Sequence, residues 1–379
     1  MKKIVVAADS FKGSLSSEQA ASAVAEAAAE LFPRCELVRL AMADGGEGTA
    51  EALLRSLGGT RVEAEVHDPL MRPVRAAYGI LPDGITAAIE LSAANGLTLL
   101  SEDERNPMNA TSFGCGELIA DALRRGCSRV LAGLGGSATN DAGTGMLEAL
   151  GARFLDADGQ PLPGNGASLG RIASADLTGL LPWLASAEFI AACDVRNCLC
   201  GPDGAACVFA PQKGADAAMV DELDRGLRNF AEVTRKACGC DLLAAGGSGA
   251  AGGIGGAMLA YLHARMVPGA ELLLDASGFD RLAAGADLVF TGEGCLDEQS
   301  LMGKVPVSVL RRASALGVPV VALAGKVRLD RNPGFAGIYE VTPPDCPPQT
   351  AMRSEVAYEN VRRAALRALK DFSENAGRF

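Results

Sequence analysis

Acidic side chains stand beside glycines at several points in the sequence, each time shortly after an apolar run. Asp9, Asp44 and Asp194 follow three such runs, and Glu293 with Asp297 follows a fourth. Carboxylate oxygens in this setting could bind Mg²⁺ or accept the proton of an attacking hydroxyl group. Acids before a helix also favour the helix dipole, so a purely structural role for Asp44 stays open.

Basic residues accompany several of these acids. Lys12 lies in the loop after Asp9, Lys304 follows the last acidic pair, and Lys213 stands as a free cation in a Gln-Lys-Gly turn. These cations could neutralise a phosphate or carboxylate group. Asp9 could instead only cap its turn, with Lys12 solvated. Arg105 could clamp a substrate carboxylate, although a loop arginine is more often solvated.

A glycine-rich stretch at residues 129–146 begins with a short apolar run and continues with small hydroxyl residues. A strand that leads into such a turn lets backbone N–H groups approach an anion, so the stretch could cradle a phosphate. A tight structural turn explains it equally well. The spacing Gly133-x-Gly135-x-x-Ala138 also matches the dinucleotide-binding fingerprint, as does Gly247-x-Gly249-x-x-Gly252, but such matches are weak signals.

Histidine-based hydrolysis is disfavoured because the chain has only two histidines, and neither lies near these loops. Phosphoryl transfer suits the residues better. It needs cations and backbone amides for the phosphates, carboxylates for Mg²⁺, and a carboxylate near the attacking hydroxyl. The sequence has neither a GxxxxGK[ST] loop nor the protein-kinase motifs, so it predicts a kinase of another architecture.

The elements that must position these residues alternate between apolar runs and amphipathic stretches, which predicts an α/β protein. We expect strands at residues 3–9, 36–41, 130–134, 187–195, 287–291, 318–327 and 338–342, with a small antiparallel set within 60–91. We expect helices from residue 16 with a capping box, at 50–58, 113–125, 146–154 and 217–235, and a closing helix that includes 361–372. The glycine-rich segment 242–264 could be a ligand lid or a close packing segment.

Length and composition narrow the functional class. The chain has 379 residues, 49% of them hydrophobic, which is enough for two domains with sizeable cores. A net charge of −11 and the absence of a basic run argue against a nucleic-acid partner. No stretch is long and apolar enough for a membrane span or signal peptide, so we expect a cytoplasmic protein. We read the eleven scattered cysteines as free thiols rather than disulfides or a zinc site.

Several of these segments, in the same order, resemble the bacterial class I glycerate kinases over nearly the whole chain. The segments that carry the resemblance are ADSFKGSL (8–15), ADGGEGT (43–49), GGSATND (135–141), ACDV (192–195), 204–214 around PQKG, and TGEG (291–294) with 296–297 and 303–304. The resemblance implies ATP- and Mg²⁺-dependent phosphorylation of D-glycerate, with 2-phosphoglycerate favoured over 3-phosphoglycerate. Whether the chain forms a homo-oligomer stays open.

The resemblance also implies a flavodoxin-like or Rossmann-like parallel-sheet domain, interrupted by a second α/β domain. We place the discontinuous domain at residues 1–90 plus 285–379 and the inserted domain at 91–284. The residues that we assign to catalysis are Asp44, Asp194 and Lys12, with Asp44 or Asp194 as the base. Those assigned to substrate binding are Asp9, Ser10, Arg105 and Lys213. Those assigned to the nucleotide are Gly135, Gly136, Ser137, Thr139 and Lys304, and those assigned to the metal ion are Glu293 and Asp297.

The chain departs from the family pattern at four positions. Ala8 stands where proline is usual, Met71 and Ala142 where glycine is usual, and Cys295 where an arginine is usual. The missing arginine leaves the proposed metal and phosphate loop short of a cation, which a neighbouring arginine or lysine could supply. Two other functions remain as alternatives: a dinucleotide-dependent oxidoreductase of a small hydroxy acid, and a non-enzymatic sugar-acid-binding protein.

Overall fold

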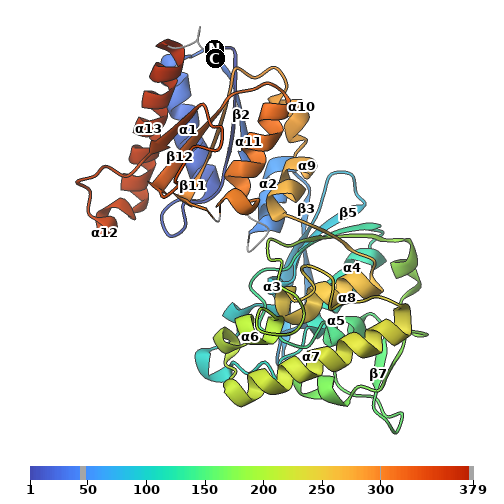
Figure 1. Ribbon diagram of the computed structural model, residues 1–379. Helices are drawn as coiled ribbons and strands as arrows, with labels where there is room; N and C mark the ends of the chain where they lie inside the picture. The colour runs from blue at the N-terminus through green and yellow to red at the C-terminus, as the bar shows by residue number, and fades with distance from the viewer. Residues whose placement is uncertain (43–47, 299, 375–379) are drawn as a thin grey trace. The chain divides into compact units, whose positions relative to one another are not determined.

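The computed structural model describes residues 1–42, 48–298 and 300–374, and its ribbon is shown in Figure 1. The chain forms two compact units. One, which we call the terminal unit, comprises Met1–Asp44 and Pro268–Phe379, and the other, the central unit, comprises Gly45–Val267. No helix in the described part of the chain is long and apolar enough to cross a membrane.

The terminal unit contains a five-stranded parallel sheet of order β13-β12-β11-β1-β2. Its strands are β1 (Lys3–Ala8), β2 (Glu36–Ala41), β11 (Leu288–Leu296), β12 (Val320–Val327) and β13 (Gly337–Glu340). Its helices are α1 (Ser17–Leu31), α9 (Gly269–Ala276), α10 (Phe279–Ala283), α11 (Val305–Ala315), α12 (Pro348–Ala351) and α13 (Ser354–Glu374). The predicted parallel α/β fold is confirmed in this unit.

The sheet of the terminal unit is wound in two directions from its middle. The chain moves from β1 outward to β2, and in the opposite direction from β11 through β12 to β13. Because parallel crossovers are right-handed, α1 and α11 cover opposite faces of the sheet. Figure 1 shows α1 and α13 side by side on one face, where their buried side chains belong to the same hydrophobic cluster as Ile4 and Val6 of β1.

Helix α1 begins where the sequence predicts it. The Ser16 hydroxyl accepts a hydrogen bond from the Gln19 N–H at 3.2 Å, and the Gln19 side chain accepts one from the Ser16 N–H at 2.9 Å. This capping box satisfies two of the backbone donors that a helix start leaves unpaired. The helix start in turn fixes the end of the loop that connects it to β1.

The central unit contains a six-stranded sheet of order β10-β9-β6-β5-β4-β3. Its elements are α2 (Thr49–Leu57), β3 (Thr60–His67), β4 (Pro73–Ile80), β5 (Thr86–Glu90), α3 (Ser92–Asn95), α4 (Phe113–Arg124), β6 (Arg129–Gly133), α5 (Thr144–Ala149), β7 (Arg153–Leu155), β8 (Ser174–Asp176), β9 (Glu188–Ala192), α6 (Ala205–Phe209), α7 (Ala217–Cys238), α8 (Ile254–Tyr261) and β10 (Arg265–Val267). Strands β5, β6, β9 and β10 run parallel, while β3–β4 and β4–β5 pair antiparallel.

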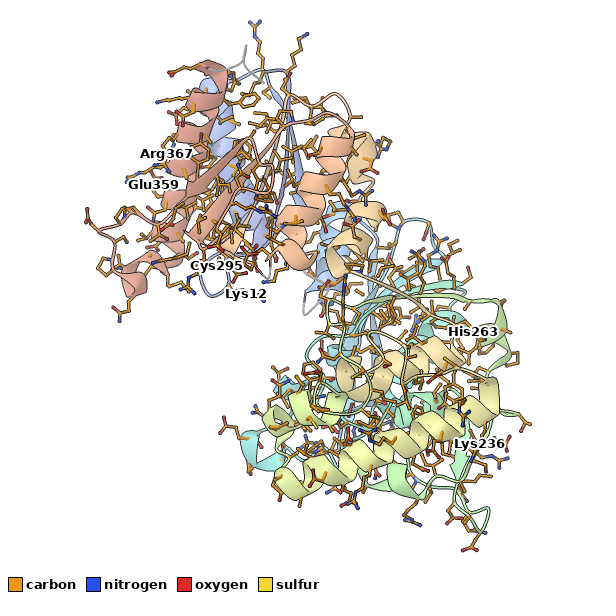
Figure 2. All side chains as sticks on the ribbon, in the orientation of Figure 1. Lys12, Lys236, His263, Cys295, Glu359 and Arg367 are labelled. Carbon is orange, nitrogen blue, oxygen red and sulfur yellow. The ribbon has the colours of Figure 1, made fainter. Side chains whose placement is uncertain are left out.

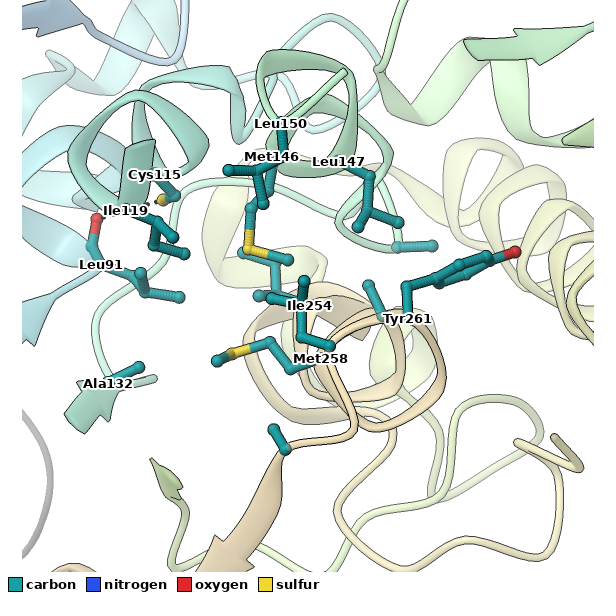
Figure 3. Close-up of a cluster of buried hydrophobic side chains, with 14 of the residues drawn as sticks. Leu91, Cys115, Ile119, Ala132, Met146, Leu147, Leu150, Ile254, Met258 and Tyr261 are labelled. Carbon is teal, nitrogen blue, oxygen red and sulfur yellow. Dashed lines mark hydrogen bonds between the residues drawn. The ribbon is translucent and has the colours of Figure 1, made fainter. Parts of the chain in front are cut away.

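One large hydrophobic core holds the helices of the central unit against this sheet. Figure 3 shows Met146 and Leu150 next to Ile254 and Met258 of α8, all of them fully buried. The segment before α8 belongs to the same packing, because a Cβ atom on Gly252 would lie 2.0 Å from the carbonyl oxygen of Thr139. Of the two interpretations offered for this segment, the structure supports close packing.

The structure divides the chain at other points than the predicted domain boundaries of 1–90 plus 285–379 and 91–284. Residues 60–90 belong to the central unit because β3, β4 and β5 extend the sheet that contains β6. Residues 268–284 belong to the terminal unit, where α9 packs on α11. The helix predicted at 146–154 also ends earlier: α5 stops at Ala149, and β7 begins two residues after Gly151.

The two positions where this chain departs from a usual glycine both have the backbone conformation that favours glycine. Met71 has a φ of 62° and Ala142 a φ of 56°. A residue with a Cβ atom is strained in this region by roughly 1–2 kcal/mol. The family pattern at these two positions therefore reflects the backbone conformation of two turns.

Candidate active site

A cavity in the terminal unit brings together charged residues from the carboxyl ends of β1 and β11 and from the loops that follow them. Its volume is 560 Å³. The predicted site residues that line it are Asp9, Ser10, Lys12, Glu293, Asp297 and Lys304. Strands β1 and β11 are neighbours from which the chain winds in opposite directions, and open α/β sheets bind ligands in the crevice beyond such a switch point. The topology thus explains why six residues from distant segments meet here.

The loop after β1 is fixed at the mouth of this crevice. The N–H group of Asp9 donates to the carbonyl oxygen of Gly292 at 2.8 Å, so the loop is tied to β11. The Asp9 carboxylate is 7% exposed and accepts a hydrogen bond from the Ser10 N–H at 2.6 Å. Asp9 therefore both caps its turn and lines the cavity, so the structural role and the ligand-binding role considered for it are compatible.

Of the predicted acidic pair, Glu293 lies within β11, which is longer than the expected strand, and Asp297 lies in the turn that follows it. The Asp297 carboxylate accepts hydrogen bonds from the N–H and the hydroxyl of Ser300, at 3.1 and 3.3 Å. The Glu293 carboxylate lies 3.9 Å from the Lys304 ammonium group. Two carboxylates suit Mg²⁺, which usually takes one or two protein ligands and completes its shell with water and substrate phosphates.

The donors in this cavity fit a metal ion that binds together with a phosphate, rather than one held by the protein alone. Among the described residues, no group of three or more His, Cys, Asp or Glu side chains could hold a metal ion. Glu293 and Asp297 would supply two hard oxygen ligands. The third and later ligands would have to come from water and from the phosphate groups that the metal ion neutralises.

A lysine stands next to the cysteine that replaces the usual arginine. Cys295 of β11 is the register partner of Lys326 of β12, and both side chains line the cavity. Figure 2 shows Cys295 near Lys12 at the same end of the sheet. Lys326 is therefore placed to supply the cation that Cys295 does not. Sequence reasoning placed Lys326 at a strand end but gave it no role, because the register between β11 and β12 was unknown.

The central unit gathers a second set of predicted residues around the glycine-rich loop. The Lys213 ammonium group donates to the Ser137 hydroxyl at 2.9 Å and to the Thr139 carbonyl oxygen at 2.6 Å. The Asn95 amide donates to the Thr139 hydroxyl at 2.9 Å. Sequence reasoning missed Asn95, since its partner lies 44 positions further along the chain.

Lys213 is not the free cation that the sequence suggested, because its side chain is only 2% exposed. Burial lowers the pKa of Lys213 to about 7, although the nearby Asp141 carboxylate acts in the opposite direction. A neutral amine still has two N–H groups, so both hydrogen bonds survive loss of the charge. The structure therefore makes Lys213 a tie between the α6–α7 connection and the glycine-rich loop.

Asp141 anchors the end of the same loop. Its fully buried carboxylate accepts four hydrogen bonds: from the Ser112 N–H at 2.8 Å, the Ser112 hydroxyl at 2.7 Å, the Gly143 N–H at 2.9 Å and the Gly145 N–H at 3.3 Å. Burial raises the pKa of Asp141 above its usual value, even though these hydrogen bonds favour the ionised form. The loop is therefore rigidly held at Thr139 and Asp141.

The remaining predicted residues lie at the edge of this buried cluster, in the exposed segment after β9, or outside the described structure. Asp194 is exposed in the segment that follows β9. The backbone of Arg105 packs on Gly214, where a Cβ atom would lie 2.2 Å from the Arg105 carbonyl oxygen. Gly135 and Gly136 are the more exposed part of the glycine-rich loop. Asp44 lies outside the described residues.

The two dinucleotide fingerprints do not have the required structural context. That motif needs a strand that passes through the glycines directly into a helix. After Gly133 the chain does not enter α5 until Thr144, and α5 is only six residues long. Gly247 follows a turn after α7 and not a strand. The oxidoreductase alternative therefore has no geometric support.

Comparison with known proteins decides the family. The model of the glycerate kinase family matches residues 4–373. The chain belongs to the glycerate kinase family. It is 43% identical to a protein named glycerate kinase from Bacillus subtilis (strain 168), with 94% of each chain covered. It is 42% identical to a protein named glycerate 2-kinase from Escherichia coli (strain K12), with 96% of each chain covered.

The fold of this family member agrees with that of a solved structure. A crystal structure described as that of a putative glycerate kinase 2 from Salmonella typhimurium LT2 superposes with a TM-score of 0.89 at 40% identity, and 99% of each chain is covered. The chain is accordingly a phosphotransferase, with ATP as the phosphoryl donor that a kinase uses. The non-enzymatic and oxidoreductase alternatives are not supported.

Proposed function

We propose that the protein catalyses the Mg²⁺-dependent transfer of the γ-phosphoryl group of ATP to D-glycerate. The proposed product is 2-phosphoglycerate rather than 3-phosphoglycerate. The observation that carries this proposal is the cavity at the switch point of the terminal unit. Four carboxylates (Asp9, Glu293, Asp297 and Glu340) and three lysines (Lys12, Lys304 and Lys326) line it at the carboxyl ends of parallel strands. Phosphoryl transfer asks a protein mainly for such positioning and charge neutralisation.

In this proposal the charged residues predicted from the sequence have defined tasks. Glu293 and Asp297 hold Mg²⁺, which neutralises the charge that develops on the phosphates when the metal ion is bound. Lys12 and Lys304 contact phosphate oxygens, and the fixed loop after β1 keeps Asp9 and Ser10 in place for a hydroxyl group. Asp194 remains our candidate for the carboxylate that accepts the proton of the attacking hydroxyl.

The substrate-binding tasks proposed for the central unit follow from the same chemistry. Gly135 and Gly136 present accessible backbone at the turn of the glycine-rich loop, where an anion could be bound. Ser137 and Thr139 shape this turn through their contacts with Lys213 and Asn95. Arg105 remains a candidate for binding a carboxylate group.

The variant Asp297→Asn tests the proposed metal site. The asparagine oxygen can still accept the hydrogen bonds from Ser300, so the turn should persist while the negative charge is lost. We expect kcat/KM with ATP and D-glycerate to fall on the order of 100-fold or more. The matched control is Asp330→Asn, an exposed carboxylate that does not line the cavity. Equal activities of the two variants would contradict the proposed metal site.

We also propose that the enzyme works in the cytoplasm. ATP is plentiful there, and the reducing environment suits a chain whose eleven cysteines are all free thiols. Immunoblotting of cytosolic and exported fractions checks this location, and recovery of the protein from the exported fraction would contradict it.

A further inference from the structure

The cavity of the terminal unit has two chemically different sides. The charged side comes from the ends of β1 and β11 and contains the residues to which we assign the metal ion and phosphates. The other side comes from the segment after β13 and from α12 and α13. It is built mainly by Val341, Pro343, Pro344, Met352 and Val361, with the Glu340 carboxylate at its edge.

The sheet order separates these two sides. Strand β13 lies two positions from β11 and three from β1. With neighbouring strands about 4.8 Å apart, the apolar side lies roughly 10–14 Å from the ends of β11 and β1. Lys326, at the end of β12, stands between the two sides. The cavity therefore extends across the strand ends, with most of its charged residues near β1 and β11 and the Glu340 carboxylate at the end of β13.

The size and lining of the cavity do not match glycerate alone. Glycerate is small and polar throughout, whereas 560 Å³ falls in the range of pockets that hold much larger molecules. An apolar wall stabilises a ligand only where the ligand has an apolar face. A purine base has two such faces, and it is joined through ribose to the phosphates that the charged side would bind.

Polar groups on the apolar side are suited to the edge of a base or to ribose. Asn360 of α13 is 7% exposed and lines the cavity. Its amide carries both a donor and an acceptor, as does the edge of a purine. Few, well-placed polar groups on an otherwise apolar wall are typical of pockets that recognise an aromatic ligand.

The glycine-rich loop of the central unit is a less suitable place for the nucleoside. Its hydroxyl groups at Ser137 and Thr139 are buried and already bonded to Lys213 and Asn95. The N–H group of Ala138 donates to the Asn95 carbonyl oxygen at 2.8 Å. The loop therefore offers little beyond its exposed glycines, which suit an anion better than a base.

We propose that the adenosine moiety of ATP binds on the apolar side of the terminal-unit cavity, between the segment after β13 and α12, with its phosphates directed along the strand ends toward β11 and β1. This inference rests on the proposed function in that it takes ATP as the phosphoryl donor. It assigns the nucleoside to residues 341–361 and not to the glycine-rich loop 135–139.

Photoaffinity labelling of the unmodified protein tests the assignment directly. The probe is 8-azidoadenosine triphosphate with Mg²⁺, whose reactive group sits on the base, and labelled peptides are identified by mass spectrometry. We expect ATP-protected labelling within residues 341–361. Protected labelling within 129–146, or at any site outside the cavity lining, would overturn the proposal.

A cavity-filling variant provides the second readout. Ala351 of α12 lines the cavity and is half-buried, whereas Ala315 of α11 is exposed and lies outside it. We expect Ala351→Trp to weaken ATP binding about tenfold or more while the binding of inorganic tripolyphosphate stays unchanged, and Ala315→Trp to change neither. The proposal would be overturned if Ala351→Trp weakened the binding of ATP and of tripolyphosphate equally, or if it weakened the binding of neither ligand.

These experiments separate this inference from the proposed function. Protected labelling within 341–361 without any turnover of D-glycerate would support the nucleoside site and contradict the proposal that D-glycerate is the phosphoryl acceptor. Turnover of D-glycerate with protected labelling elsewhere would support the proposed function and overturn the nucleoside site.

Discussion

Replacing Asp141 with asparagine tests whether the glycine-rich loop depends on a buried carboxylate. An asparagine oxygen can take the place of Oδ2, which accepts three hydrogen bonds from Ser112 and Gly145. Its NH₂ group must then face the N–H of Gly143, where Oδ1 now accepts at 2.9 Å. One acceptor is lost, and two donors are forced together in a site without solvent.

The expected cost follows from these contacts. Loss of a hydrogen bond to a charged group costs about 1.5–3 kcal/mol, and a buried unpaired N–H group about 1–3 kcal/mol. Removing a buried charge offsets part of this, because burial already raises the pKa of Asp141. We expect a net loss of about 3 kcal/mol. At roughly 2–4 °C per kcal/mol for a unit of this size, the midpoint should fall about 6–12 °C.

Differential scanning calorimetry at pH 7 measures this effect, with Asp156→Asn as the matched control. Asp156 also accepts two backbone hydrogen bonds, from Asp158 and Gln160, but in a turn near the surface. Its replacement should lower the midpoint by less than about 2 °C. If Asp141→Asn unfolded within 2 °C of the wild type, the claim that this carboxylate anchors the loop would be refuted.

Three further substitutions have defined outcomes. Burial lowers the pKa of Lys213 from an ordinary 10.5 to about 7, so between these pH values the unfolded chain binds more protons than the folded protein. The stability of the wild type relative to Lys213→Met should therefore increase when thermal unfolding is measured at rising pH from 7 to 9. A stability difference that stays constant over this range would refute the argument. Met71→Gly should raise the thermal midpoint by roughly 1–3 °C, since an exposed side chain at positive φ is removed; a lower midpoint would argue against strain there. Lys326→Met should raise KM for ATP about tenfold. Adding Cys295→Arg should return KM to the wild-type value, because a cation at either position faces the same cavity; a KM that stays raised in the double variant would argue against this.

Local patterns predicted much of the fold. The strand at 36–41 has the bounds that the sequence indicated, and the capping box of α1 lies at the predicted residues. Both predictions succeed because hydrophobic periodicity and capping act over a few residues. The antiparallel pairing of β3 and β4 was also predicted. The parallel pairing of β5 with β6 was not, since it depends on which strand the chain returns to after α4.

The candidate site was predicted in part. The acids near the carboxyl ends of β1 and β11 were found because carboxylates at the ends of parallel strands have a recognisable sequence pattern, and the structure brings them into one cavity. Lys213 was misjudged as a free cation because its burial comes from contacts with residues more than 70 positions away. The apolar wall around Pro343 and Met352 was missed, because such residues carry no chemical signature in a sequence.

The most direct test of the account is phosphorus NMR of the reaction of the purified protein with ATP, Mg²⁺ and D-glycerate. We predict that ADP appears together with the resonance of 2-phosphoglycerate, and that both signals require the hydroxy acid. Formation of 3-phosphoglycerate would contradict the proposed regiochemistry. Absence of ADP formation with D-glycerate would contradict the proposed substrate and with it the account's central claim.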